Sequence, residues 1–383
     1  MGRTERAKLP EFEPGGAAHD QIPGALVSDV NAAIEERVAG MGHSRRAMLA
    51  KTLGAGVGAS AIGSVLAACG ASSGGGSEPA RASGPSGPNR KTITIGYPQV
   101  GGDSIQFFAA IAKGAKQAAA DLGVKLDYRA TGGQNIDLSA GQSRLTAAVV
   151  ATKPTGLMTG FWDAAAMREP VESAVQQGTT VVTLNATPDV NKPSLGAITY
   201  VGQDERLAGE QAGARFKAAG FKKTLILNHD PSQVNISNRV AGFKKGFGGP
   251  TATVITPQGD PTTSANRIKA ALTSHADADS IMGTAPVVTE FAVNALKSAN
   301  KPNIKLATFD YSLKLLPLIA SGQIVFGIDQ QQYMQGYYPV LIITMLRSLG
   351  FAPVRPYLTG PAFVTAKEID LVKQEIGSGV RSG

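Results

Sequence analysis

The sequence predicts an α/β protein made of two doubly wound parallel-sheet lobes that are joined by a hinge. Short β-branched segments alternate with helical segments from residue 92 onward, a pattern typical of parallel sheets with helices on both faces. The chain has 383 residues, and one hydrophobic core usually stops growing below this length. About ten strands over about 290 residues therefore favour two sheets over one.

Each predicted strand is a short apolar run rich in Val, Ile, Thr and aromatic residues. The strands are 92–97, 125–129, 156–159, 180–184, 197–201, 224–228, 252–256, 280–283, 305–309 and 324–328. Runs of this length without strict alternation are typical of strands buried on both faces.

Helical patterns lie between most of these strands. In the first, Ile105, Phe108 and Ala112 recur on one face of a helix. The others are 138–151, 164–177, 207–218, 239–247, 264–274, 288–298, 313–320 and 335–349. A barrel of eight strand–helix units is the competing architecture, and in both folds a ligand site is expected at the carboxyl ends of the strands.

Composition excludes several classes of function. The 37 Lys and Arg against 29 Asp and Glu leave a net charge of +8, but these charges are interspersed rather than gathered into a basic run, so we expect no nucleic-acid partner. One cysteine excludes an internal disulfide framework. None of the four histidines lies at metal-ligand spacing from another, so we expect neither a metal nor a cofactor.

The N-terminal residues have the features of an export address. Arg45 and Arg46 precede an uncharged, small-residue stretch, 53–68, which is too short and too Gly-rich for a membrane-spanning helix. The stretch is followed directly by Cys69, the only cysteine of the chain. Residues 1–68 resemble a twin-arginine export signal joined to a bacterial lipobox, which implies lipidation of Cys69 at the outer face of the cytoplasmic membrane or in the periplasm. The alternative is a buried Ala/Gly helix with an ordinary cysteine.

Residues 69–90 are rich in Gly, Ser and Pro and predict a flexible tether. A lipid at Cys69 would then hold the folded residues at a membrane surface. The folded part is expected to begin near residue 91.

The residues after the predicted strands are mostly amides, carboxylates and aromatics. The sets are 98–103, 160–163, 185, 228–230, 259–260, 284, 310 and 329–330. Planar amides and carboxylates pair with adjacent hydroxyl groups, and aromatic faces stack on the C–H side of a sugar ring. This set of side chains favours a polyhydroxylated ligand.

Several motifs, in this order and spacing, resemble the exported solute-binding proteins of sugar ABC transporters, of the ribose/galactose type. The resemblance spans residues 92–364 and implies the type I periplasmic-binding-protein fold. Its motifs are Phe107-Phe108, Lys113-Gly114-Ala115, Val181-Val182-Thr183-Leu184-Asn185, Val201-Gly202-Gln203-Asp204, Asn238-Arg239-Val240-Ala241-Gly242-Phe243, Thr308-Phe309-Asp310 and Ile328-Asp329-Gln330.

The resemblance implies a sugar site. It assigns ligand contacts to Phe107 or Phe108, and to Asn185, Arg239, Asp310 and Gln330. The helical periodicity places Phe108 in the core, which favours Phe107 as the ligand contact.

Four further residues near the strand ends are also candidates: Asp103, Gln106, Trp162 and Asp163. The chain has Ile105-Gln106 where the ribose type has an Asn, and Asn185-Ala186 where it has Asp-Arg. These departures favour a monosaccharide or polyol other than ribose, with Trp162 as an added stacking platform. Trp162 as plain packing, and Asp310 with Arg239 as a structural ion pair, are the alternatives; Asp204 is expected to be structural and His229 to be an ordinary loop residue.

The resemblance further implies two lobes, residues 91–202 with 331–356 and residues 203–330 with 357–376, joined by crossings near Gly202, Gln330 and Pro356. The implied function is a monomeric, lipid-anchored receptor that closes around its ligand and delivers it to an ABC permease. It is not expected to be an enzyme. The alternatives are a secreted carbohydrate-active enzyme that uses Asp103, Asp163 or Asp310, a transcription-factor effector domain, and a sugar-sensing receptor input.

Overall fold

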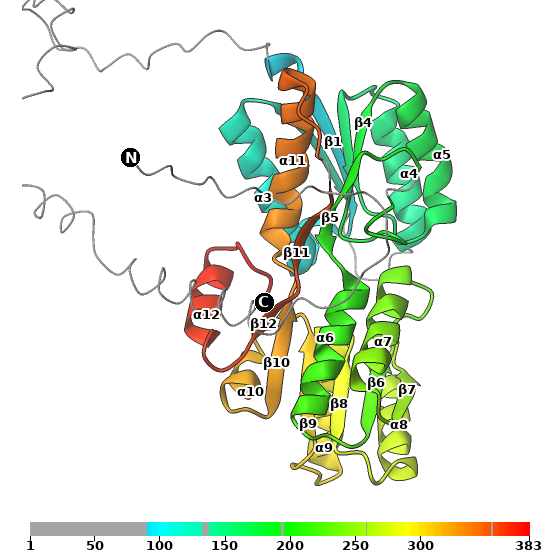
Figure 1. The fold of residues 1–383 in the computed structure, drawn as a ribbon, viewed down its shortest axis with the longest axis vertical. Helices are drawn as coiled ribbons and strands as arrows, with labels where there is room; N and C mark the ends of the chain where they lie inside the picture. The colour runs from blue at the N-terminus through cyan, green and yellow to red at the C-terminus, as the bar shows by residue number, and fades with distance from the viewer. Residues whose placement is uncertain (1–89, 132–137, 193–194, 258, 354) are drawn as a thin grey trace, which may run out of the picture. The chain divides into compact units, whose positions relative to one another are not determined.

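The computed structural model describes residues 90–131, 138–192, 195–257, 259–353 and 355–383 (Figure 1). The predicted export signal, the lipidation site Cys69 and nearly all of the tether lie outside the described residues. Within the described part, no helix is long and apolar enough to cross a membrane.

The described strands form two six-stranded sheets, which confirms the predicted fold class. The first sheet has the order β11-β5-β4-β3-β1-β2, and the second has the order β12-β10-β9-β8-β6-β7. All neighbours are parallel except β10 and β12. The first sheet consists of β1 (Thr94–Val100), β2 (Lys125–Thr131), β3 (Gly156–Thr159), β4 (Thr180–Leu184), β5 (Thr199–Gln203) and β11 (Tyr357–Gly360). The second consists of β6 (Thr224–Asn228), β7 (Thr251–Ile255), β8 (Ser280–Gly283), β9 (Lys305–Phe309), β10 (Ile324–Asp329) and β12 (Ala362–Val364).

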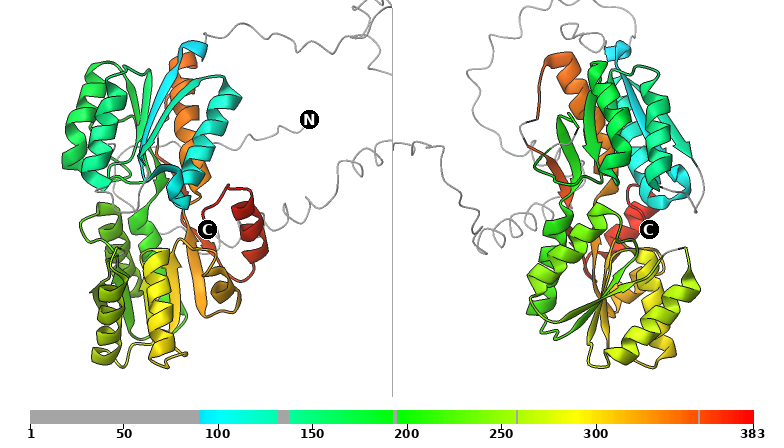
Figure 2. Two further views of the ribbon diagram at one scale, coloured as in Figure 1. Left: turned by 180° about the vertical axis from the view of Figure 1, so that it is seen from behind. Right: turned by 90° about the vertical axis from the view of Figure 1, so that its right-hand side faces the viewer.

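Helices cover both faces of each sheet (Figure 2). The first lobe has α3 (Gln106–Leu122), α4 (Leu138–Val150), α5 (Ala164–Gln176), α11 (Gln332–Leu349) and the 3₁₀ turns η1 (Arg90–Thr92) and η2 (Gly102–Ser104). The second lobe has α6 (Glu205–Ala218), α7 (Val234–Phe247), α8 (Pro261–Ser274), α9 (Pro286–Ser298), α10 (Leu316–Ala320) and α12 (Ile369–Gly377).

Alternation along the strands divides the core of the first lobe into two layers. Met158 and Val182 belong to the cluster that contains the buried residues of α3 and α11. Their neighbours Leu157 and Val181 belong to the cluster formed with α4 and α5. Successive side chains of a strand point to opposite faces, so continuous apolar strands must be buried on both sides.

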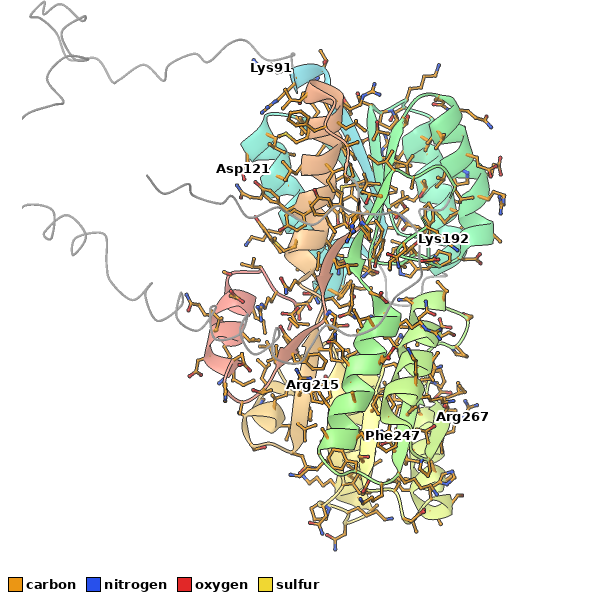
Figure 3. All side chains as sticks on the ribbon, viewed as in Figure 1. Lys91, Asp121, Lys192, Arg215, Phe247 and Arg267 are labelled. Atoms are coloured by element: carbon orange, nitrogen blue, oxygen red, sulfur yellow. The ribbon has the colours of Figure 1, made fainter. Side chains whose placement is uncertain are left out.

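The second sheet is built in the same way. Ile226 and Met282 pack with α6 and α7, whereas Leu225 and Ile281 pack with α8 and α9. On the first of these faces the Arg215 guanidinium lies 3.9 Å from the centre of the Phe363 ring, so α6 also contacts β12 (Figure 3 labels Arg215).

The chain passes between the two sheets at three places within the described residues. The first two crossings follow β5 and β10, close to Gly202 and Gln330. The third lies between Gly360 and Ala362 rather than near Pro356. Residues 357–360 therefore belong to the first lobe, in contrast to the boundary expected from the sequence, because β11 pairs with β5 before the chain continues into β12.

Helices α6 and α7 approach each other closely because glycine occurs where each meets the backbone of the other. A Cβ atom at Gly209 would overlap the carbonyl oxygen of Arg239, and one at Gly242 would overlap that of Arg206. A side chain at either position would force the helices apart.

We expect Gly242→Ala to lower the free energy of unfolding by about 2 kcal/mol or more, because the added methyl group meets backbone rather than a flexible side chain. Urea unfolding followed by circular dichroism measures this change. Gly377→Ala is the matched control, since a Cβ atom at Gly377 meets nothing within 4 Å and the position is helical; it should be neutral or slightly stabilising. Equal stability of the two variants would contradict this account of the packing.

Candidate functional site

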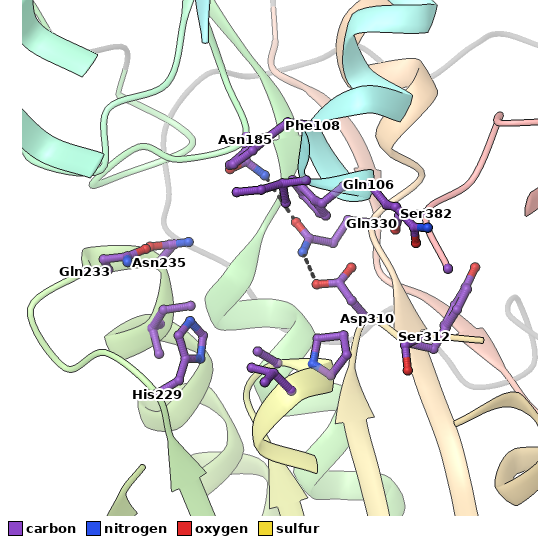
Figure 4. Close-up of a pocket in the computed structure, with 18 of the residues that line it drawn as sticks. Gln106, Phe108, Asn185, His229, Gln233, Asn235, Asp310, Ser312, Gln330 and Ser382 are labelled. Carbon is purple, nitrogen blue, oxygen red and sulfur yellow. Dashed lines mark hydrogen bonds between the residues drawn. The ribbon is translucent and has the colours of Figure 1, made fainter. Parts of the chain in front are cut away.

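A cavity of about 530 Å³ lies at the carboxyl ends of strands from both sheets, and we call it the interlobe cavity. The first lobe contributes the start of α3 and the residues after β3 and β4, and the second contributes α7, the start of α9 and the residues after β6, β9 and β10. Its lining residues include Gln106, Phe107, Phe108, Trp162, Asn185, His229, Gln233, Asn235, Arg239, Glu290, Asp310, Tyr311, Gln330, Ser382 and Gly383. Figure 4 shows most of these side chains directed into one space.

Asn185 and Asp310 occupy corresponding places in the two lobes. Each follows the end of a strand, β4 or β9, and each has a positive φ, 61° for Asn185 and 54° for Asp310. Only Asn and Asp among residues with a side chain adopt this left-handed conformation with some ease, and such strained positions are concentrated at binding sites. In each lobe the left-handed residue follows the end of its strand, and its side chain lines the cavity.

A chain of hydrogen bonds connects these two residues across the lobes. The Asn185 amide donates to Gln330 Oε1 over 3.5 Å, and the Gln330 amide donates to Asp310 Oδ2 over 2.7 Å (dashed lines in Figure 4). Gln332 donates to the other carboxylate oxygen of Asp310 over 3.1 Å. Gln330 lies at the second crossing, so the residue that joins the lobes also joins their polar groups.

A buried ion pair fixes the cationic residue of the cavity. The Arg239 guanidinium donates from Nε and Nη2 to both oxygens of Glu205, over 2.7 and 2.8 Å, and from Nη1 to the carbonyl oxygen of Thr284 over 2.9 Å. Arg239 and Glu205 are 4% and 5% exposed. Burial alone would lower the pKa of Arg239, but the Glu205 carboxylate raises it. Arg239 is thus a fixed cation in a fixed orientation.

Asp310 lies 3.8 Å from Arg239 Nη1 and is the second carboxylate near this cation. Burial raises the pKa of Asp310 to about 7, since its attraction to Arg239 and the hydrogen bond from Gln330 offset the desolvation only in part. Glu205 already neutralises Arg239, and its negative charge raises the pKa of Asp310 further. The Asp310–Arg239 ion pair, which the sequence offered as the alternative to ligand contacts, is therefore the weaker of two, and the Glu205 pairing was not foreseen from the sequence.

His229 also lines the cavity, although the sequence predicts an ordinary loop histidine. Its Nδ1 lies 2.8 Å from the hydroxyl of Thr284. Two effects lower the pKa of His229 to about 3, of which burial is the larger and the nearby positive charge of Arg239 the smaller. His229 is therefore a neutral hydrogen-bonding group. Among the described residues, no three or more His, Cys, Asp or Glu side chains form a group that could hold a metal ion.

Three aromatic side chains of the first lobe line the same cavity. Phe107 and Phe108 pack edge to face with ring centres 5.3 Å apart, and Phe108 packs in the same manner on Trp162 at 6.0 Å. Phe108 belongs to the core, as the periodicity predicted, and it lines the cavity as well. Trp162 likewise packs in the core and lines the cavity, so its packing role is observed and its stacking on a ligand stays a prediction.

Seven of the nine predicted ligand residues line the cavity, and Asp103 and Asp163 do not. Asp103 follows a turn with positive φ at Gly101 and Gly102 and accepts a hydrogen bond from the Tyr128 hydroxyl over 3.0 Å. Asp163 is the N-cap of α5, where its side chain accepts from two backbone N–H groups. Asp204 caps α6 in the same way, which confirms its structural assignment.

Asn235 lines the cavity and was missed in the sequence. It is 5% exposed, and its Oδ1 has no hydrogen-bond partner among the described residues. A buried amide oxygen without a partner is costly unless a ligand or water supplies a donor. Asn235 precedes Arg239 by four residues on α7, so helical spacing from Arg239 could have identified it.

Comparison with known proteins connects this architecture with a family. Residues 100–348, more than half of the chain, match the periplasmic binding protein domain. The xylose/arabinose-binding protein XylF of Sulfolobus acidocaldarius is 25% identical over 235 residues, which is 57% of this chain and 58% of that protein. The match thus spans less than two thirds of that relative.

Two solved structures are similar over nearly their whole length. The carbohydrate transporter of Acidothermus cellulolyticus 11B, in complex with myo-inositol, is 29% identical with a TM-score of 0.67, over 76% of this chain and 99% of that chain. The solute-binding protein of Burkholderia graminis, in complex with D-arabinose, is 22% identical with a TM-score of 0.64, over 74% and 98%, and shares the fold. With the matched residues spanning both sheets and most of the cavity, the chain belongs to the periplasmic binding protein family.

Proposed function

We propose that this protein captures a monosaccharide or a cyclic polyol in the interlobe cavity and delivers it to the permease of an ABC transporter. The observation that carries the proposal is the convergence of amide, carboxylate, guanidinium and aromatic groups from both lobes on one cavity. The ligands of two similar proteins, xylose or arabinose for one and myo-inositol for the other, support the same class.

The chemistry of the lining fits several adjacent hydroxyl groups. Asp310 offers carboxylate oxygens, Arg239 offers N–H donors held in one plane, and Asn235 offers an amide oxygen that has no partner in the described part of the chain. A hydroxyl can donate to one such group and accept from another, which compensates for the water it loses. Phe107, Phe108 and Trp162 would lie against the apolar faces of the ring.

Capture would proceed by closure of the lobes about the three crossings. A ligand that contacts Asn185 in one lobe and Asp310 in the other gains both sets of contacts only in the closed form, so it shifts the population toward closure. The permease would recognise that form. This mechanism forms no covalent bond and needs no cofactor.

A carbohydrate-active enzyme is a weaker interpretation. Of the three acidic residues that the sequence suggested for such a role, Asp310 alone lines the cavity. Glu205, which lies near it, is engaged with Arg239. Glu290 also lines the cavity, but its two carboxylate oxygens accept hydrogen bonds from Ser312 over 2.6 Å and from Lys314 over 3.2 Å. A glycosidase needs two carboxyl groups that flank a bond, one of them free to give or take a proton.

A thermal-shift screen of the purified residues 91–383 against pentoses, hexoses and myo-inositol tests the proposal. We expect one or a few of these ligands to raise the melting temperature, because a ligand at 100 times its Kd stabilises the folded state by about 2.7 kcal/mol. Isothermal titration calorimetry then gives the affinity. No shift with any sugar or polyol would refute the proposal, and turnover of a labelled sugar would favour the enzyme.

Uptake of the labelled ligand separates transport from sensing. Cells that lack the protein should lose high-affinity uptake if it serves a permease. Unchanged uptake together with an altered response to the sugar would assign the protein to sensing instead.

We expect Asp310→Asn to weaken sugar binding about tenfold or more and to remove its dependence on pH. The ionised carboxylate is the better acceptor for hydroxyl groups, so binding should favour the ionised form. With a pKa of about 7, only about one molecule in 30 has an ionised Asp310 at pH 5.5. The affinity of the unmodified protein should therefore fall by up to about 30-fold between pH 8 and pH 5.5.

The free energy of unfolding of the ligand-free protein should fall as the pH rises, whereas the affinity for the sugar should increase. The pKa of Asp310 is higher in the folded protein than its ordinary value of 3.8, so its ionisation costs stability as the pH rises from about 4 through 7. Asp163→Asn is the control for affinity, since it retains the helix cap and lies outside the cavity. Affinity that is independent of pH in the unmodified protein would contradict this role for Asp310.

We also propose that the protein is exported and attached to the membrane through a lipid at Cys69. The twin arginines and the small-residue stretch before the only cysteine support this proposal. Cys69→Ser should move the full-length protein from the membrane fraction to the soluble extract and abolish its labelling by a radioactive fatty acid. Arg45→Lys with Arg46→Lys should keep it inside the cell. An unchanged membrane fraction with Cys69→Ser would exclude the lipid anchor.

A further inference from the structure

The end of the chain returns to the interlobe cavity. Ser382 and Gly383 line it, and Figure 4 shows Ser382 on the side opposite His229. No motif in the sequence indicated a role for these residues, and the family match ends at residue 348. We call residues 378–383 the C-terminal segment.

Helix α12 and the turn after it direct this segment toward the cavity. Ile369 and Val372 anchor α12 in the core of the second lobe. The helix ends at Gly377. Gly379, two residues later, has a φ of 70°, and the N–H of Val380 bonds back to the carbonyl oxygen of Glu375 over 3.0 Å. A left-handed glycine after a helix reverses the chain, so the following residues lead back along the lobe.

Arg381 attaches the segment beside the proposed ligand contacts. Its guanidinium lies 3.0 Å from Asp329 Oδ2 and 2.6 Å from Glu375 Oε2. Asp329 is fully buried, and it also accepts from the Tyr311 hydroxyl over 3.0 Å. Asp329 precedes Gln330 and Tyr311 follows Asp310, so the attachment point adjoins two proposed contacts of the ligand.

The first lobe reaches the segment as well, since the Lys113 ammonium of α3 donates to the carbonyl oxygen of Ser378. The C-terminal segment is thus in contact with both lobes. A segment in this position can change its contacts when the lobes move.

Ser382 has the properties of a ligand contact. It is 6% exposed, it lines the cavity, and within the described residues its hydroxyl makes no hydrogen bond to the protein. A hydroxyl that opens onto the cavity and has no such partner can donate to a ligand oxygen and accept from a ligand hydroxyl.

We propose that the C-terminal segment forms a wall of the sugar site, that Ser382 Oγ hydrogen-bonds to one ligand hydroxyl and contributes to specificity, and that Arg381 is a positioning residue for this wall. The inference rests on the proposed sugar-binding function. It predicts that the identity of residue 382 affects which sugar hydroxyls are recognised.

The test uses calorimetry with the sugar or polyol found by the thermal-shift screen and with its monodeoxy analogues, one for each hydroxyl. Ser382→Ala should weaken binding of the parent ligand by about threefold to tenfold, as expected for one neutral hydrogen bond. One monodeoxy analogue should bind the unmodified protein and Ser382→Ala equally, because the contacted hydroxyl is already absent. A merely structural role would weaken all ligands alike. Arg381→Ala should reduce the preference for the same hydroxyl.

Ser382→Phe tests the position of the segment independently of hydrogen bonding. The ring would fill part of the cavity, so binding of every ligand should fall at least about 30-fold while the melting temperature of the free protein stays close to that of the control. Ser274→Ala, an exposed serine of the second lobe, is the matched control for the hydroxyl deletion.

The outcomes distinguish the two proposals. If the unmodified protein binds none of the sugars, the proposed function fails and this inference fails with it. If the unmodified protein binds a sugar, but Ser382→Ala and Ser382→Phe bind it and all its analogues with unchanged affinity, the C-terminal segment is no wall of the site and only this inference is overturned.

Discussion

The buried pair of Arg239 and Glu205 is the interaction on which the site depends. Two charges this deeply buried are tolerated only with nearly ideal geometry, and here the guanidinium fork meets both carboxylate oxygens. That geometry requires α6 and α7 to approach closely, which the glycines at 209 and 242 permit. The charge arrangement in the cavity therefore depends on the packing of the second lobe. Separating α6 from α7 would leave both Glu205 and Arg239 buried without their partner.

The ion pair also determines the state of its neighbour. With Arg239 already neutralised by Glu205, the buried Asp310 keeps a raised pKa and stays sensitive to what enters the cavity. Asn185 faces it from the other lobe through Gln330. The cavity thus combines a fixed cation, a responsive carboxylate and a row of amides that crosses from lobe to lobe, so that a ligand with several hydroxyl groups can connect the two lobes.

Much of the fold could be predicted from local patterns. Five of the predicted strands, among them Thr180–Leu184 and Lys305–Phe309, have the observed bounds, since buried parallel strands are uninterrupted β-branched runs. The later part of the chain was harder. Strands β11 and β12, which begin at Tyr357 and Ala362, are short and partly exposed, so neither has the uninterrupted apolar run of a buried strand. For this reason the predicted lobe boundary near Pro356 was wrong. Seven predicted ligand residues line one cavity. Asp103 and Asp163 lie outside it, where Asp103 accepts a hydrogen bond from the Tyr128 hydroxyl and Asp163 caps helix α5.

By itself, the sequence determined most of the strands and helices between residues 92 and 349, which side chains follow those strands, and that Cys69 is preceded by an export-like stretch, because these properties depend on neighbours along the chain. Only the tertiary structure decided that Glu205 pairs with Arg239 and that Asn235 lines the cavity. It also decided that Ser382, near the end of the chain, lies at the same site as Gln106. Those relations depend on distances between elements far apart in sequence, which are determined by helix packing and by the three crossings.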